Sequence, residues 1–143
     1  MWITGVDEAG RGPVIGPLVV AALSIPTEDE EKLRQQNVKD SKLLSPQRRS
    51  ELEEWILDQE GWLHRVIICQ PARIDSYVAK MGLNILEVEL FAEALNAIEQ
   101  REGTIIVDAC DVDEGRFASR IASRLENWPW PVQLISEHKA DFN

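Results

Sequence analysis

The sequence predicts an α/β fold in which a mixed sheet is flanked by helices within one domain, residues 1–143. Two apolar strands near the N-terminus are separated by a short glycine-rich stretch, which favours an antiparallel hairpin. Further apolar strands then alternate with helical patterns, which favours a sheet covered by helices. An apolar content of 44% supports a single hydrophobic core, and no linker, repeat or low-complexity segment suggests a second domain.

The first half of the chain is expected to contribute three strands. Residues 1–8 begin as an apolar strand, and residues 18–25 form a near-continuous apolar run that suits a strand buried on both faces. Thr27 is expected to cap a short helix that ends near residue 36, with acidic residues in its first turn. Residues 62–69 are predicted to form the third strand.

The helices and strands of the second half follow from their periodicity and caps. Ser45, followed by proline, predicts a helix over residues 45–59, and a short helix is expected over 71–78. Residues 104–107 and 132–135 are predicted strands, and residues 114–127 a predicted helix. The clearest helix covers residues 83–100, with an apolar stripe of Leu83, Leu86, Leu90, Phe91, Ala94, Leu95 and Ile98.

Composition restricts the classes of function. The chain carries 15 basic and 25 acidic residues, a net charge of −10. Affinity for nucleic acid that is independent of sequence comes from Lys and Arg contacts with phosphates, so binding is expected to be weak and sensitive to salt. No apolar run approaches the length of a membrane span. Cys69 and Cys110 form no CxxC pair, so we expect both to behave as small apolar residues. The protein is then expected in a reducing, cytoplasmic compartment.

The first strand ends on two adjacent carboxylates, Asp7 and Glu8, followed by a glycine loop. Two carboxylates on a rigid strand tip are a plausible seat for a hard divalent cation, provided that a twist or bulge lets both face one site. A dinucleotide loop is disfavoured because Gly16 comes one residue late, and Pro17 stands where a P-loop needs lysine. The alternative is a hairpin turn with two solvated acids.

Four ordered segments closely resemble ribonuclease HII. They are VDEAGRGP with GPLVVAA at residues 6–22, KDSKLLS at 39–45, VDA with RFA at 107–118, and EHKAD at 137–141. The last segment is similar to the archaeal and eukaryotic branch. The resemblance implies a ribonuclease H-like fold, with the C-terminal helices of that family missing from these 143 residues.

The resemblance implies that Asp7, Glu8, Asp108 and Asp141 are catalytic carboxylates that bind Mg²⁺ or Mn²⁺. Two such ions, about 4 Å apart, can activate a water and stabilise the leaving oxygen. The implied enzyme is a type II ribonuclease H, an endonuclease that hydrolyses the RNA strand of RNA–DNA hybrids. It also nicks duplex DNA 5′ to embedded ribonucleotides, giving 5′-phosphate and 3′-hydroxyl ends.

Substrate recognition is also implied by the resemblance. Gly10, Arg11 and Gly12 match the loop that senses the ribose 2′-hydroxyl, the group that distinguishes RNA from DNA. Ser41 and Lys42 match positions that bind backbone phosphate. Without the resemblance, the segment around Ser41 and Lys42 is an ordinary polar turn.

Two further groups allow alternatives. His138 beside Asp141 could carry protons, although a structural or supporting role is favoured. Trp128 and Trp130 could stack on bases, but the flanking prolines favour a loop packed on the sheet edge.

The resemblance stops two residues after Asp141, whereas family members continue with further helices that carry substrate contacts. A carboxylate in a terminal segment is poorly fixed, so we expect weak metal binding and low or absent nuclease activity in this form. An apolar patch is expected where those helices would cover the sheet. The alternative functions are a catalytically impaired fragment that binds hybrids, and an enzyme of the same fold that acts on another phosphoester.

Overall fold

The structure is a computed structural model that describes residues 1–9, 17–36, 45–99, 102–108, 113–126, 128 and 134–137. At residues 9, 46, 49, 108, 114 and 134–137 only the backbone is described. A five-stranded sheet has the order β3-β2-β1-β4-β5. This mixed sheet with flanking helices confirms the predicted architecture.

The first three strands form the antiparallel part of the sheet, as the sequence predicts. Strand β1 (Trp2–Ala9) pairs with β2 (Leu18–Pro26), and β2 pairs with β3 (Leu63–Cys69). Between β1 and β2 the buried hydroxyls of Thr4 and Ser24 share a hydrogen bond of 2.8 Å. This bond satisfies two polar groups inside an otherwise apolar layer.

The remaining strands run parallel to β1. Strand β4 (Thr104–Asp108) pairs with β1, and β5 (Leu134–Glu137) pairs with β4. Strands that run parallel end at the same edge of a sheet, and helical crossovers connect them. The C-terminal ends of β1, β4 and β5 therefore lie together, although more than 90 residues separate β1 from β4 in sequence.

The first helical region differs in its start from the prediction. Residues Thr27–Asp29 form a 3₁₀ turn, and α1 covers Glu30–Gln35. The predicted cap at Thr27 is wrong, because both its backbone N–H and its hydroxyl donate to the Met1 carbonyl, at 3.0 and 3.4 Å. Thr27 therefore ties the end of β2 to the chain start instead of capping a helix.

The other helices are α2 (Pro46–Leu57), α3 (Pro71–Lys80), α4 (Leu83–Ala97) and α5 (Glu114–Ala122). The predicted cap at Ser45 is confirmed, because its Oγ accepts from the Arg48 N–H at 3.1 Å. Helix α5 ends five residues before the predicted end. Beyond this end, Asn96 Nδ2 on α4 donates to the Arg124 carbonyl at 3.1 Å, and Asn96 Oδ1 accepts from the Glu126 N–H at 2.8 Å. These contacts with α4 fix the direction of the chain after α5.

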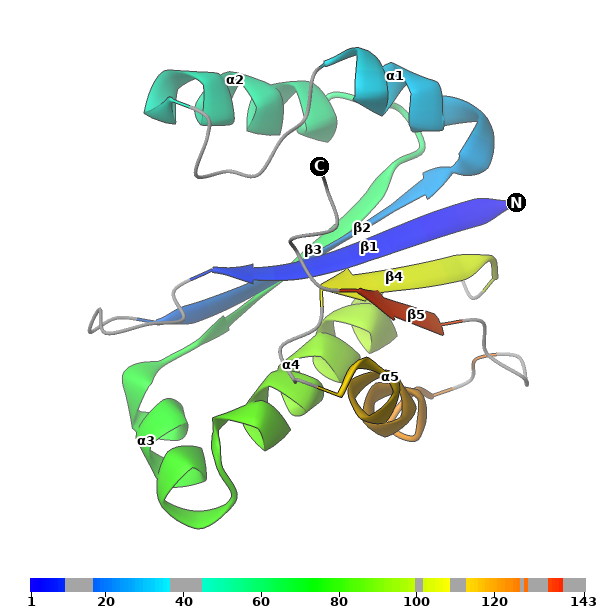
Figure 1. Cartoon of the computed structure of the whole chain (residues 1–143). Coiled ribbons are helices and arrows are strands. Elements are labelled where there is room, and N and C mark those ends of the chain that lie inside the picture. Colours follow the sequence, from blue (N-terminus) through cyan, green and yellow to red (C-terminus); the bar gives the residue numbers. More distant parts are fainter. Residues whose placement is uncertain are drawn as a thin grey trace.

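The core lies between the sheet and α4. The predicted stripe is buried except for Leu83, which is partly buried. Phe91 on α4 meets Phe117 on α5 edge to face at 5.3 Å between ring centres. Glu87 is fully buried on the same helix, which the sequence does not predict because glutamate is seldom buried completely. Figure 1 shows α4 and α5 along one face of the sheet, with α3 beside α4, and α1 and α2 on the other side.

Strand β3, at one edge of the sheet, exposes apolar side chains on the face away from α4. Val66 is 53% exposed and Ile68 is 58% exposed, while Cys69 on the opposite face is buried. Val66 and Ile68 thus place apolar surface at this edge of the sheet. Within the described part of the chain, no helix is both long enough and apolar enough to cross a membrane.

Candidate active site

The candidate site begins where β1 and β4 end side by side. Val6 on β1 pairs with Val107 on β4, so Asp7 and Asp108 each follow one residue after this pair on neighbouring parallel strands. Asp108 is the last residue of β4. Backbone pairing thus places two of the four predicted carboxylate residues side by side at the C-terminal ends of two neighbouring strands. Ends of parallel strands are where sites commonly form in α/β folds.

Asp7 and Glu8 point to opposite faces of β1. The pairing of β1 with β2 is one to one from Trp2 to Ala9, so no bulge interrupts the strand. Asp7 is exposed, and Glu8 is half-buried on the face that carries buried Val6. Of the twist or bulge that the sequence interpretation required, the bulge is therefore not observed between β1 and β2. Near the C-terminal end of β1, the Asp7 carboxylate thus lies on one face of the sheet and the Glu8 carboxylate on the other.

A local hydrogen bond constrains the Asp7 side chain. Its Oδ1 accepts from the backbone N–H of Glu8 at 2.8 Å. A carboxylate has two oxygens and about four acceptor positions, so this bond leaves acceptor capacity for a cation or water. The exposed position of Asp7 gives a solvated ion access to that capacity.

The structure adds one carboxylate residue that the sequence interpretation did not assign. Glu137 is the last residue of β5 and pairs in register with Asp108. It belongs to the EHKAD segment, so the signal was in the sequence, but only strand pairing shows that it lies beside Asp108. Strands β4 and β5 thus end on acidic residues, and β1 carries Asp7 and Glu8 just before its last residue, Ala9.

The other predicted site residues lie outside the described residues: Gly10, Arg11, Gly12, Ser41, Lys42, Asp141 and the neighbouring His138. The side chain of Asp108 is likewise not described. Among the side chains that are described, no group of three His, Cys, Asp or Glu residues has the arrangement of a metal site. The chemistry of the donors still suits a hard divalent cation, because Asp7, Glu8 and Asp108 offer only carboxylate oxygens.

Asp113 takes a structural role close to the site in sequence. Its side chain caps α5 by accepting from the Arg116 N–H at 2.9 Å. The cap begins the helix that packs Phe117 into the core. Asp113 thus helps to anchor the chain that continues from Asp108.

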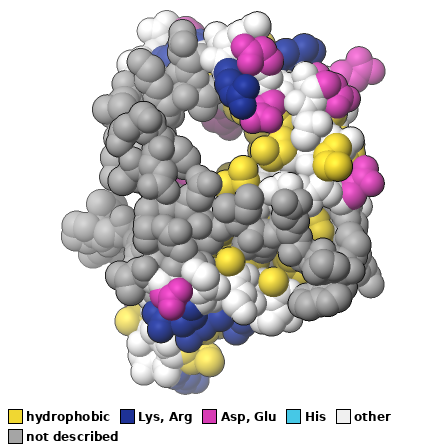
Figure 2. All heavy atoms as spheres, turned by 45° about the vertical axis from the view of Figure 1, so that its right-hand side comes forward, with side chains coloured by type: hydrophobic (Ala, Val, Ile, Leu, Met, Phe, Trp, Pro, Cys, Tyr) yellow, Lys and Arg dark blue, Asp and Glu magenta, His cyan; other side chains and the backbone are white. Residues whose placement is uncertain are grey.

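The described charges do not form a continuous basic strip on the face in Figure 2. Lys and Arg side chains gather in an upper and a lower group there, with acidic side chains among the upper group and against the lower one. On α1, for example, Arg34 contacts Glu30 at 2.7 Å and Glu31 at 3.4 Å. Such pairs neutralise basic residues that would otherwise attract phosphate.

Trp128 and Cys69 behave as packing residues. Trp128 is partly buried against the hydrophobic core, which supports the packing interpretation for this residue, whereas Trp130 lies outside the described residues. Cys69 is 1% exposed, and burial raises the pKa of its thiol although Arg73 opposes the shift. The thiol therefore stays neutral, as expected for a small apolar residue; Cys110 lies outside the described residues.

Arg73 belongs to an ion pair that joins α3 to α4. It donates to both carboxylate oxygens of Glu93, at 2.5 and 3.4 Å, and lies over the Tyr77 ring, 5.5 Å from its centre. The bond to Glu93 raises the Arg73 pKa further above its usual range. The Arg73 guanidinium is thus bound within the interface between α3 and α4.

Comparison with known proteins agrees with this architecture. A model of the ribonuclease HII family matches residues 4–143. The ribonuclease HII of Pyrococcus furiosus is 46% identical over 141 residues, which cover 99% of this chain and 60% of the relative. The chain thus spans about 60% of the length of the curated relatives that it matches.

Solved structures show the same relationship. The crystal structure of ribonuclease H2 from Pyrococcus horikoshii OT3 matches with a TM-score of 0.86 and 42% identity, over 99% of this chain and 64% of that one. The ribonuclease HII of Archaeoglobus fulgidus, solved in complex with PCNA, matches over the same shares with a TM-score of 0.81 and 35% identity. These matches confirm the fold predicted from the sequence.

Proposed function

Because the chain belongs to the ribonuclease HII family, we propose that it is a metal-dependent endonuclease acting on RNA within RNA–DNA duplexes. The observation that carries this proposal is the parallel pairing of β1 with β4, which brings Asp7 and Asp108 to one sheet edge. Carboxylates gathered at one strand edge repel each other unless a cation lies between them. A site of this kind suits phosphodiester hydrolysis, where negative charge builds up on the reacting oxygens.

Asp7, Glu8, Asp108 and Asp141 are the proposed metal-binding residues. Bound Mg²⁺ or Mn²⁺ would supply an activated water and stabilise the leaving oxygen. The protein holds the carboxylates in place: β1 supplies Asp7 and Glu8 on adjacent residues of a fully paired strand, and β4 supplies Asp108. Strands are rigid supports, which favours the narrow geometric tolerance of a catalytic site.

Recognition of RNA is assigned to the loop that follows β1. Gly10, Arg11 and Gly12 come directly after Ala9, so a backbone that approaches the ribose 2′-hydroxyl there would be close in sequence to Asp7 and Glu8. Ser41 and Lys42 are proposed to bind the phosphate backbone. Together, these loop and phosphate-binding residues would determine which sugar lies beside the carboxylates. The proposed cleavage is a nick on the 5′ side of that sugar, which leaves 5′-phosphate and 3′-hydroxyl ends.

A cleavage assay tests the proposal. The protein is incubated with Mg²⁺ or Mn²⁺ and a DNA duplex that contains one ribonucleotide, and products are resolved at single-nucleotide resolution. A nick on the 5′ side of the ribonucleotide supports the endonuclease. Binding without a nick supports a catalytically impaired hybrid-binding protein, and neither result supports action on another phosphoester.

The hybrid-binding alternative is tested with the part of the family that these 143 residues do not span. The assay therefore includes a second protein, in which this chain is joined to the C-terminal remainder of the Pyrococcus furiosus relative. We expect the 143-residue form to bind metal weakly and cleave slowly. We expect the extended form to bind metal more tightly and to cleave faster. Equal cleavage rates would show that the added segment is dispensable.

Substitution of Gly10 or Gly12 with alanine is expected to reduce selectivity for ribose more than affinity for duplex. Phosphate contacts position a protein on nucleic acid, whereas contacts to the 2′-hydroxyl discriminate RNA from DNA. Binding of each variant to an RNA–DNA hybrid and to DNA of the same sequence measures the ratio of affinities. Equal losses on both duplexes would argue against a sensor role for this loop.

A further inference from the structure

Strand β3 is the outer strand of the sheet on the side away from β5. It pairs with β2 along all of its 7 residues, and its other backbone edge has no strand beside it in the part of the chain that the structure describes. An outer strand presents a row of N–H and C=O groups, and proteins commonly block such an edge with charges, prolines or bulges. An edge that is not blocked can pair with another strand.

The first half of β3 is blocked in this way, and the second half is not. Arg65 donates to the His64 carbonyl at 2.6 Å and forms an ion pair with Glu99, so a guanidinium lies beside the start of the strand. From Val66 to Cys69 the strand carries no charged residue and no proline. Its pairing with β2 is one to one, so no bulge turns this half away from a partner.

The side chains of this second half alternate between the core and the surface. Cys69 is buried and Ile67 is partly buried against the core, whereas Val66 and Ile68 are each more than half exposed. On β2, Ala21 pairs with Val66 and is also exposed. Single exposed apolar side chains need no explanation, but these adjoin a strand edge that is not blocked.

We propose that the edge of β3, residues 65–69, is a homodimer interface at which two copies of this chain pair antiparallel about Ile67. In that register Val66 of each copy lies opposite Ile68 of the other copy, so the strand is its own complement. All four exposed apolar side chains then meet an apolar side chain on the same face of a continuous sheet. Such cross-strand pairs are the contacts that stabilise paired strands.

The neighbouring registers fit less well. A shift by one residue would set exposed side chains against buried ones and turn the helical layers of the two copies to opposite faces. A register centred on Val66 sets Ile68 against His64, and one centred on Ile68 sets Val66 against Gln70. Of these registers, the one about Ile67 gives the largest number of apolar pairs.

Charge favours a second copy over nucleic acid as the occupant of this edge. The chain has a net charge of −10, so two copies repel each other, but β3 contains no acidic residue and the contact lies where repulsion is weakest. A phosphate backbone would need basic contacts, and the one basic residue of β3 other than His64, Arg65, is paired with Glu99. We therefore expect dimerisation to strengthen with salt, which screens the repulsion between copies.

An exchange of charges tests the interface and its register together. Val66→Lys and Ile68→Glu are each expected to weaken dimerisation of the 143-residue protein at least about tenfold, because a buried charge without a partner is costly and a symmetric dimer contains each substitution twice. The double variant should recover most of the loss, since the introduced lysine of one copy then lies opposite the introduced glutamate of the other. Sedimentation equilibrium over a range of protein and salt concentrations measures the association constants.

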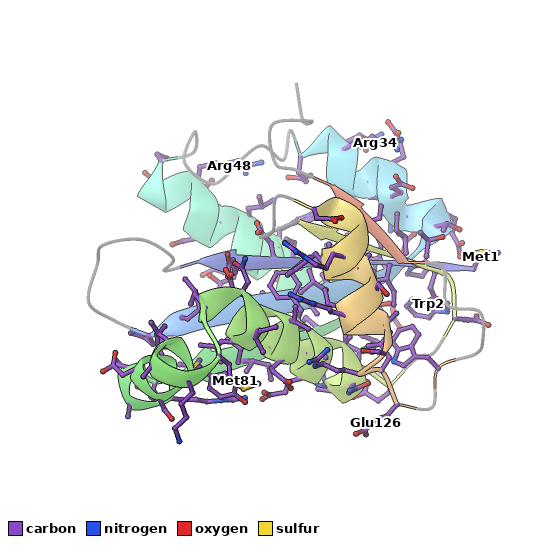
Figure 3. All side chains as sticks on the ribbon, turned by 60° about the horizontal axis from the view of Figure 1, so that its bottom comes forward. Met1, Trp2, Arg34, Arg48, Met81 and Glu126 are labelled. Carbon is purple, nitrogen blue, oxygen red and sulfur yellow. The ribbon has the colours of Figure 1, made fainter. Side chains whose placement is uncertain are left out.

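Met81→Lys is the matched control. Met81 is more than half exposed, as Val66 is, but it directly follows α3 in the helical layer and not in the sheet (Figure 3). The substitution changes the net charge by the same amount as Val66→Lys and should not weaken association. Circular dichroism and thermal melts show whether each variant keeps its fold.

Four outcomes would overturn the proposal. They are a monomer at every protein and salt concentration, a dimer that either single substitution in β3 leaves intact, equal weakening by Met81→Lys, and no recovery in the double variant. A further measurement identifies another occupant, with this chain joined to the C-terminal remainder of the Pyrococcus furiosus relative. If the extended protein is monomeric where the 143-residue form dimerises, the remainder and not a second copy covers β3, and the proposal is wrong. None of these measurements depends on cleavage, so they are independent of the proposed nuclease activity.

Discussion

Replacing Asp108 with asparagine in the form extended by the C-terminal remainder of the relative is expected to lower hybrid cleavage at least about 10²-fold. Even residues that only support metal ligands cost 10–100-fold when removed, so loss of a ligand carboxylate should cost at least as much. Asparagine keeps the size of the side chain, and β4 pairs through its backbone, so the fold should persist. Without metal, thermal stability should stay the same or rise, because one member of a group of like charges is removed. Single-turnover cleavage and calorimetric Mn²⁺ titration, with a thermal melt of the metal-free protein, measure these effects.

Asp75→Asn is the matched control for Asp108. Asp75 is exposed on α3, beneath the sheet, and the substitution makes the same change in charge. We expect wild-type cleavage and Mn²⁺ affinity from this variant. Normal cleavage by Asp108→Asn would exclude a ligand role for Asp108, and equal losses in both variants would show that total charge, not the site, controls activity.

Gly103→Ala is expected to destabilise the fold by about 3 kcal/mol and to lower Tm by about 10 °C. Gly103 has a φ of +94°, and a Cβ at this position would lie 1.9 Å from the Trp2 carbonyl oxygen. That oxygen belongs to the backbone at the start of β1, next to the pair formed by Ile3 and Thr104. The clash would therefore push β1 and β4 apart at the end opposite Asp7 and Asp108.

Gly61→Ala separates the clash from the backbone strain. Gly61 has a similar φ of +83°, but a Cβ there meets nothing within 4 Å. This control should lose only about 1–2 kcal/mol, the cost of a positive φ for alanine. Urea unfolding followed by tryptophan fluorescence compares the two variants. Equal midpoints would mean that the close approach between Gly103 and Trp2 does not constrain the sheet.

The sequence by itself determined the elements whose signals are local. Apolar runs predicted all five strands, the last of them two residues early, and the cap at Ser45 with the following proline placed the start of α2 correctly. These signals act between residues a few positions apart, where caps, turns and side-chain periodicity are set by the chain itself. The set of carboxylate residues to examine, in contrast, came from the resemblance of four short segments to ribonuclease HII.

Only the tertiary structure decided which elements meet and which way their side chains face. The strand order places β4 beside β1, and the register sets Asp108 against Glu137 on β5, which no local pattern specifies. Unbroken pairing with β2 sends Asp7 and Glu8 to opposite faces, whereas the sequence interpretation required a twist or bulge for both to face one site. The physical reason is that backbone hydrogen bonds between strands are chemically alike along the chain. Their partners are selected by packing of the whole sheet against α4, and therefore by residues distant in sequence.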